Sequence, residues 1–166
     1  MTCKHNSQSA VIALGCREIE PGQGHEAGRA LLAQLYEAHV GGEMPAIVIG
    51  ERGKPYFADK SVHFSISHTP RHVFCALSSR PIGIDAEELT RNIDLRLAGK
   101  ILSPTEKAQF EAATDKRRAL LTFWVLKEAD GKQNGFGINA NPNKTAFSLD
   151  DPRVTEQDGC LVAIVD

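Results

Sequence analysis

The sequence predicts an α+β fold built mainly from antiparallel strands and helices. Short apolar or alternating segments bounded by turn residues fill most of the first half, and this pattern is typical of strands. Longer segments with helical periodicity and helix-cap signals follow in the second half. A length of 166 residues allows one full domain or two small halves that share a core.

The first half is predicted to combine several strands with one helix. Strands are expected over 11–16, 46–49, 62–67, 73–78 and 82–87, with a turn over 51–55 and a helix over 26–39. In the third of these strands, Val62, Phe64 and Ile66 alternate with His63, Ser65 and Ser67. Because successive side chains point to opposite faces, we expect this strand to be buried on one face only.

The second half is predicted to be mainly helical. Ser103, Pro104 and Glu106 have the spacing of a capping box with proline at the first helical position, so a helix should begin there. A longer helix is expected over 115–132. Between Leu120 and Leu126 nearly all faces of this helix carry apolar residues, which predicts that this part is buried. Closing strands are expected over 147–149 and 161–165.

Composition and charge exclude several classes of protein. The 19 Lys and Arg residues against 21 Asp and Glu residues give a net charge of −2, which disfavours a nucleic-acid binder acting through its overall charge. No apolar segment is long enough to span a membrane, and the polar residues 1–10 do not resemble a signal peptide. The four cysteines are far apart and form no C-x-x-C pair, which favours a reduced, cytoplasmic protein over a zinc site.

Two carboxylates in the segment from Gly83 to Glu87 are the first candidates for chemistry. Residues two apart in a strand share a face, so Asp85 and Glu87 should point the same way. Mg²⁺ suits such a pair, because it takes one or two carboxylates and is often completed by substrate phosphates. The alternative is a solvated strand end without a ligand.

The end of the long helix supplies a third carboxylate and two cations. Glu128 and Lys132 are i,i+4 neighbours on one helix face, and Lys127 lies about 100° away. These side chains would suit a metal-bound phosphate. The alternative is an exposed, salt-bridged helix end worth about 0.3–0.5 kcal/mol.

A third group of polar residues lies at a strand end. Ser67 and His68 could donate hydrogen bonds to a phosphate, and Lys54 would add positive charge. Ser67, His68 and Asp85 also have the residue types of a hydrolase triad. That interpretation is disfavoured, because adjacent residues on a strand diverge and the chain has no G-x-S-x-G motif.

Taken together and in this order, these segments resemble the 4′-phosphopantetheinyl transferases of the long, pseudo-dimeric type. The shared motifs are G-K-P, S-I-S-H, G-I-D-x-E and W-x-x-K-E-A-x-x-K, at 53–55, 65–68, 83–87 and 124–132. The helix start at 102–106 also resembles the family. The resemblance covers 53–138 well and the two ends weakly.

The resemblance implies a fold and an activity. The fold would be two similar halves about a pseudo-twofold axis, with a coenzyme-A-binding half at 1–79 and a half carrying the metal and catalytic residues at 80–166. The activity would be holo-acyl-carrier-protein synthesis: transfer of the 4′-phosphopantetheine of coenzyme A to a serine of an apo acyl or peptidyl carrier protein, releasing adenosine 3′,5′-bisphosphate. The protein would act as a monomer, without nucleic acid or membrane. The rivals are a non-catalytic module that binds coenzyme A or a carrier protein, and a Mg²⁺-dependent phosphohydrolase.

The resemblance also assigns roles to the candidate residues. Asp85, Glu87 and Glu128 would hold Mg²⁺, and Glu128 would also take the proton of the serine, directly or through a water. Lys127 and Lys132 would neutralise the pyrophosphate and the leaving group. The remaining candidates would hold the nucleotide at its 3′-phosphate; these are Lys54, Ser67 and His68.

Two departures from the family pattern stand out. The first half is short for the long type, so part of the coenzyme-A-binding surface is expected to be missing. Asp130 and Gly131 replace an apolar pair before the second lysine. Because glycine inside a helix costs about 1 kcal/mol relative to alanine, we expect the helix to loosen there and Lys132 to shift.

Overall fold

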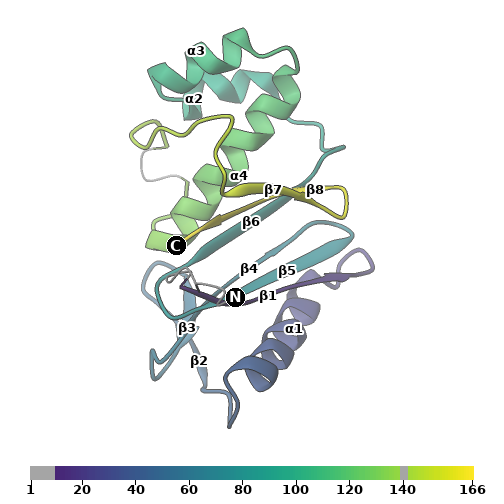
Figure 1. The fold of residues 1–166 in the computed structure, drawn as a ribbon, viewed down its shortest axis with the longest axis vertical. Helices are drawn as coiled ribbons and strands as arrows, with labels where there is room; N and C mark the ends of the chain where they lie inside the picture. The colour runs from purple at the N-terminus through teal and green to yellow at the C-terminus, as the bar shows by residue number, and fades with distance from the viewer. Residues whose placement is uncertain (1–9, 139–141) are drawn as a thin grey trace, which may run out of the picture.

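The computed structural model describes residues 10–138 and 142–166 and consists of two three-stranded antiparallel sheets with helices on their outer faces (Figure 1). Cys3 and His5 lie outside the described residues. The first half contains β1 (Val11–Glu18), α1 (Gly24–His39), β2 (Ile47–Ile49), β3 (Pro55–Phe57), β4 (His63–His68) and β5 (His72–Ser78). The second contains β6 (Gly83–Glu88), η1 (Leu95–Leu97), α2 (Ala98–Ile101), α3 (Pro104–Ala112), α4 (Lys116–Asn134), β7 (Val154–Gln157) and β8 (Cys160–Val165).

The first sheet has the order β1-β5-β4, and α1 covers one of its faces. The apolar residues that α1 turns inward, such as Leu31 and Leu32, pack against Val73, Cys75 and Leu77 of β5. The predicted strands and helix of this half are confirmed to within a few residues. The turn expected over 51–55 connects a short hairpin, because β3 pairs with β2.

The second sheet has the order β6-β8-β7, and α4 packs across β6 and β8. The strand predicted over 147–149 is wrong. Those residues form an irregular segment in which the Phe147 amide donates to the Glu106 carboxylate, 3.0 Å away. The edge strand of this sheet is instead β7, which the sequence analysis missed and which pairs with β8.

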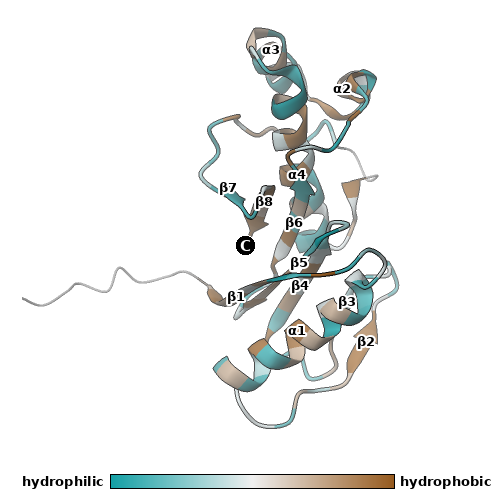
Figure 2. Ribbon diagram, turned by 90° about the vertical axis from the view of Figure 1, so that its right-hand side faces the viewer, coloured by the Kyte–Doolittle hydropathy of each residue, from teal (hydrophilic) through white to brown (hydrophobic). Residues whose placement is uncertain are grey.

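The two sheets pack face to face and share a core. Phe74 and Ala76 of β5 meet Ile84 of β6 and Val162 of β8, and all four are almost fully buried. In both halves the strand order is first, third, second in chain order, which is a repeat of topology. Figure 2 shows the two three-stranded sheets between α1, near one end of the molecule, and α3 at the other end.

This packing corrects the prediction that β4 is buried on one face only. Ser65 and Ser67 are buried as well, because their face of β4 meets β6. Each hydroxyl accepts a hydrogen bond from a β6 amide: Ser65 from Ile84 at 3.1 Å and Ser67 from Ala86 at 3.2 Å. The two serines therefore join the halves of the molecule.

In the second half, α3 begins where the capping box predicted, and α4 begins within a residue of its predicted start. The capping box of Ser103 and Glu106 is present, and Asp115 caps α4 by accepting from the Arg118 amide. The expectation that Gly131 loosens α4 is wrong, since the helix runs on to Asn134. A Cβ on Gly131 would lie 2.6 Å from the carbonyl carbon of Gly137, so glycine allows the following turn to pack on the helix. None of the described helices has the length and apolarity that a membrane span requires.

Candidate active site

The site forms where α4 crosses β6 at close range. A Cβ on Gly83 would lie 1.8 Å from the Ala129 carbonyl oxygen, so only glycine lets the strand approach the helix this closely. The strand then presents Asp85 and Glu87 to one face of the helix. Side chains four residues apart along that face are Trp124, Glu128 and Lys132.

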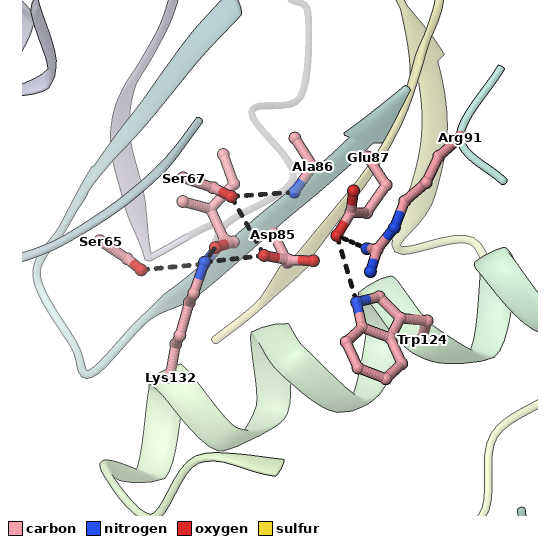
Figure 3. A network of polar contacts seen from close by, with 9 residues as sticks. Ser65, Ser67, Asp85, Ala86, Glu87, Arg91, Trp124 and Lys132 are labelled. Atoms are coloured by element: carbon pink, nitrogen blue, oxygen red, sulfur yellow. Dashed lines mark hydrogen bonds and ion pairs between the residues drawn. The ribbon is translucent and has the colours of Figure 1, made fainter. Parts of the chain in front are cut away.

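Asp85 is buried at the centre of the site (Figure 3). Its Oδ1 accepts from Lys132 Nζ at 2.7 Å and from Ser67 Oγ at 3.0 Å. Its Oδ2 is buried and has no hydrogen-bond partner among the described residues. Burial raises the pKa of Asp85, and the Lys132 and Ser67 contacts oppose that rise.

Glu87 lies on the same face of β6 and is held by two donors. Its Oε1 accepts from the Arg91 guanidinium and from Trp124 Nε1, the latter at 3.2 Å (Figure 3). Burial raises the pKa of Glu87 to about 7, although Arg91 lowers it. The interpretation of this segment as a solvated strand end is wrong, because Asp85 is only 5% exposed.

Glu128 and Lys132 share the helix face that meets β6, as the spacing predicted. Lys132 pairs with Asp85 and also donates to the Ile84 carbonyl at 3.1 Å. Glu128 is half-buried, and burial together with the negative charge of Asp85 raises its pKa. Lys132 therefore links α4 to β6 through Asp85, and its positive charge also opposes the rise in the pKa of Glu128.

Lys127 lies on a different face of α4, and the structure does not bring it to the carboxylates. Its side chain is 2% exposed and pairs with Glu106 of α3 at 2.8 Å. Lys127 Nζ also donates to the carbonyls of Pro142 and Thr145, the latter at 2.8 Å. The predicted contact of Lys127 with a pyrophosphate is not supported by this geometry, because its ammonium is committed to the core.

Ser67 and His68 point to opposite faces of the first sheet. The Ser67 hydroxyl contacts Asp85 and β6, whereas the His68 ring lies against Gly24, the first residue of α1. A Cβ on Gly24 would lie 2.5 Å from His68 Cγ. These positions contradict a Ser67-His68-Asp85 relay, since the serine contacts the aspartate directly. They also separate Ser67 from the phosphate role that we expected it to share with His68.

Lys54 lies at the other end of β4 from His68. Burial lowers the pKa of His63, the first residue of β4, and the charge of Lys54 lowers it further. His68 is the last residue of β4, and the strand spans about 16 Å between the two histidines. Lys54 Nζ donates to the Gln133 carbonyl at 2.8 Å and lines a cavity of about 250 Å³. Other residues around this cavity include Arg52, Ser65 and Lys132.

The chain is similar to known proteins over most of its length. Residues 81–161 match the family described as the 4′-phosphopantetheinyl transferase superfamily. The 4′-phosphopantetheinyl transferase AcpT of Escherichia coli O157:H7 is 31% identical over 132 residues, which are 76% of this chain and 67% of AcpT. The chain belongs to the 4′-phosphopantetheinyl transferase superfamily. This finding confirms the resemblance on which the assignment of residues was based.

Other relatives match a smaller part of this transferase-family chain. The 4′-phosphopantetheinyl transferase Sfp of Bacillus subtilis strain 168 is 42% identical over 93 residues, covering 54% of the chain and 41% of Sfp. A second 4′-phosphopantetheinyl transferase of Bacillus subtilis is 34% identical over 106 residues, covering 62% of the chain and 47% of the relative. The chain thus spans less than half the length of these two relatives.

The carboxylates of this family member are of a type that binds divalent cations, but they do not form a compact group of ligands. Asp85 offers a buried oxygen without a partner, and carboxylate oxygens are the ligands that Mg²⁺ prefers. Within residues 10–138 and 142–166, however, no three His, Cys, Asp or Glu side chains form a ready metal-binding group. Glu87 is turned toward Arg91 and Trp124 instead.

Three residues that contact the predicted site residues were given no role in the site from the sequence. Trp124 was detectable, because it lies four residues before Glu128 on the same helix face. Arg91 follows β6 in an irregular turn, and Glu106 was identified only as part of a capping box. Their contacts with Glu87 and Lys127 join segments 4 to 37 residues apart, and no local pattern encodes such contacts.

Proposed function

We propose that the protein transfers the 4′-phosphopantetheine of coenzyme A to a serine of an apo carrier protein and releases adenosine 3′,5′-bisphosphate. The observation that carries the proposal is Asp85, buried with one oxygen on Lys132 and one without a partner. Leaving a buried carboxylate oxygen unsatisfied costs about 1–3 kcal/mol or more. A bound cation would remove that cost, so the observation supports a ligand site.

The cation proposed for this site is Mg²⁺, with Asp85 and Glu128 as ligands and Glu87 as a third ligand after reorientation. When bound, Mg²⁺ would supply Lewis-acid stabilisation of charge on the pyrophosphate oxygens. Lys132 would neutralise the same pyrophosphate, since its ammonium is partly exposed beside Asp85. Glu128 would accept the serine proton, directly or through a water.

For the nucleotide we propose two contact regions rather than one. His68 lies at the first turn of α1, where unpaired backbone amides favour anions, and this position suits the 3′-phosphate. Lys54 and the cavity beside Lys132 would contact another part of coenzyme A. We assign Ser67 to the positioning of Asp85, and Lys127 to the packing of α3 against α4. Neither residue then makes the phosphate contact that the resemblance implied.

One experiment tests the reaction directly. The protein is incubated with an apo carrier protein, coenzyme A and Mg²⁺, and the mass of the carrier is measured. We expect modified carrier with the wild type, and none with Asp85→Asn or with excess chelator. Cleaved coenzyme A beside unmodified carrier would indicate a phosphohydrolase instead.

A second candidate is a non-catalytic module that binds coenzyme A or a carrier protein as a monomer. Its support is that Asp85 and Glu87 each pair with a cationic side chain of the protein, Lys132 and Arg91 respectively. Calorimetric titration with coenzyme A, combined with the carrier assay, separates the two candidates, because both would bind coenzyme A and only the transferase would modify the carrier. Binding without any carrier modification, with several acyl and peptidyl carriers tried, would favour the module.

A further inference from the structure

Arg91 is the second cation of the site and is bound to Glu87, one of the three carboxylates proposed to hold the metal. Its guanidinium donates to Glu87 Oε1, the same oxygen that accepts from Trp124 Nε1 (Figure 3). The guanidinium carbon also lies 5.1 Å from the centre of the Trp124 ring, within the range of a cation–π contact. Arg91 and Trp124 thus both occupy Oε1 of a carboxylate that the metal would also need.

Arg91 is placed so that it can leave this contact. It lies in the irregular turn after β6, and its side chain is 35% exposed, whereas that of Glu87 is 21% exposed. A guanidinium that leaves Glu87 would therefore be hydrated at little cost. Its partner carboxylate Glu87, on β6 beneath α4, would stay in the site.

Protein cations balance part of the negative charge of the site. Lys132 faces Asp85 and Arg91 faces Glu87, so two single positive charges are set against two of the three carboxylates. A divalent cation held by the three carboxylates would compete with Arg91 for the Oε1 atom of Glu87. The same carboxylate oxygen cannot serve both cations at full strength, because two positive charges at contact distance repel each other.

We infer that Arg91 is a built-in competitor of the divalent cation, holding Glu87 in the metal-free protein and releasing it when the metal binds. The inference rests on the metal site of the proposed function. It predicts that the metal alone binds more weakly to the wild type than to a protein without Arg91. Arg91 is thus a positioning residue that regulates metal loading through Glu87.

The protein carries a natural reporter of this exchange. Trp124 is the single tryptophan of the chain, and its indole contacts both Glu87 and Arg91. If the guanidinium leaves the ring when the metal binds, the fluorescence of Trp124 should change along the same titration curve as metal binding. Without Arg91, this change should be smaller.

The test measures Mn²⁺ binding to the substrate-free protein by electron paramagnetic resonance, in parallel with Trp124 fluorescence. Arg91→Ala should bind Mn²⁺ about three- to tenfold more tightly than the wild type, as expected for the loss of a partly exposed ion pair. Arg91→Lys, which keeps the charge, should stay near the wild type. The matched control is Arg71→Ala, because Arg71 pairs with the neighbouring Glu88 at 3.2 Å and its loss changes the net charge equally.

The outcomes are separable. Weaker Mn²⁺ binding by Arg91→Ala would overturn the inference, because Arg91 would then support Glu87 as a ligand. Equal tightening by Arg71→Ala would also overturn it, since the effect would be one of net charge. If neither the wild type nor Arg91→Ala binds Mn²⁺, the proposed metal site itself fails. A variant that no longer folds, as judged by circular dichroism, is replaced by Arg91→Gln with the same expectation.

Discussion

The buried carboxylate of Asp85 is fixed by two neighbours that differ in chemistry. Lys132 supplies charge, whereas Ser67 supplies a neutral hydroxyl that is itself fixed by the Ala86 amide. A carboxylate held in this way keeps one orientation, and its other oxygen keeps a defined direction. The hydroxyl of Ser67 is therefore part of what would prepare Asp85 for a cation.

Ser67→Ala should weaken metal binding, whereas Ser65→Ala should not. Both serines are buried on β4, and each hydroxyl accepts a hydrogen bond from a backbone amide of β6. Each substitution therefore leaves one amide without that partner and should lower the free energy of unfolding by about 1–3 kcal/mol. Only Ser67 also contacts Asp85. Mn²⁺ affinity measured at matched folded fraction checks the difference. Equal affinities for the two variants would mean that Ser67 serves the fold alone.

Asp94 is expected to make stability depend on pH in acid. The hydrogen bonds of Arg96 lower the pKa of Asp94 from 3.8 to about 2. A lowered carboxylate pKa contributes stability that is present above the unfolded value and is lost as pH falls through the folded one. Asp94→Asn should thus lower the melting temperature at neutral pH, with the difference closing between about pH 4 and pH 2. Thermal unfolding of both proteins across this pH range measures the difference in melting temperature. Because the ion pair is exposed, added salt should reduce that difference. A difference that is constant with pH would contradict the ion pair.

The candidate site shows which residue roles a sequence can reveal. Strand alternation placed Asp85 and Glu87 together, and helical spacing placed Glu128 with Lys132, because both periods are local properties of the backbone. The role of Lys127 was misjudged, since the partner of a helix face depends on the element that packs there. For Lys127 that element is α3. Its residue Glu106 lies 21 positions earlier in the chain and forms an ion pair with Lys127.

Among the elements, α3, α4 and the segment before β7 are joined by one buried charge pair. Glu106 is fully buried and accepts from Lys127, from the Ser103 amide at 2.7 Å and from the Phe147 amide at 3.0 Å. Lys127 in turn donates to the Thr145 carbonyl. The pair thus replaces regular secondary structure in holding the irregular segment near Phe147 against the helices.

Lys127→Met should destabilise the protein by about 3–5 kcal/mol, because it leaves the Glu106 carboxylate buried without its counter-charge. The double variant Lys127→Met/Glu106→Gln should recover part of the loss, since the isolated charge is gone. Urea unfolding measures both. If Lys127→Met is as stable as the wild type but binds coenzyme A poorly, the lysine belongs to the nucleotide site after all.

Elements with local end signals were predicted best. The capping box at Ser103 and the glycine-bounded end of α1 are set by residues within one turn, so their positions were readable. The edge strand β7 was missed because its polar residues form a strand only by pairing with β8. Residues 147–149 were assigned to a strand for the opposite reason. Their apolar side chains pack against the helical core of the second half without any strand partner.

At the scale of the whole molecule, the site depends on contacts between the two sheets. Asp85 belongs to β6, but its hydroxyl partner Ser67 belongs to β4. The shared core of Phe74, Ala76, Ile84 and Val162 keeps these strands together. Lys54 adds a further link, since it donates to the Gln133 carbonyl at the end of α4. We therefore expect the two halves to unfold as one cooperative unit.

Leu32→Ala tests this cooperativity from the far side of the molecule. Leu32 is fully buried between α1 and the first sheet and belongs to the core of the first half. Its truncation should cost about 2–5 kcal/mol. Trp124 lies in α4 of the second half, so its fluorescence reports a region that Leu32 does not contact. If the sheets are coupled through their shared core, the urea midpoint of Trp124 fluorescence should fall together with that of circular dichroism.

A Trp124 midpoint that stays at the wild-type value, while part of the circular dichroism signal is lost earlier, would mean that the halves fold independently. The joint placement of Ser67 and Asp85 would then depend on the docking of two separate units.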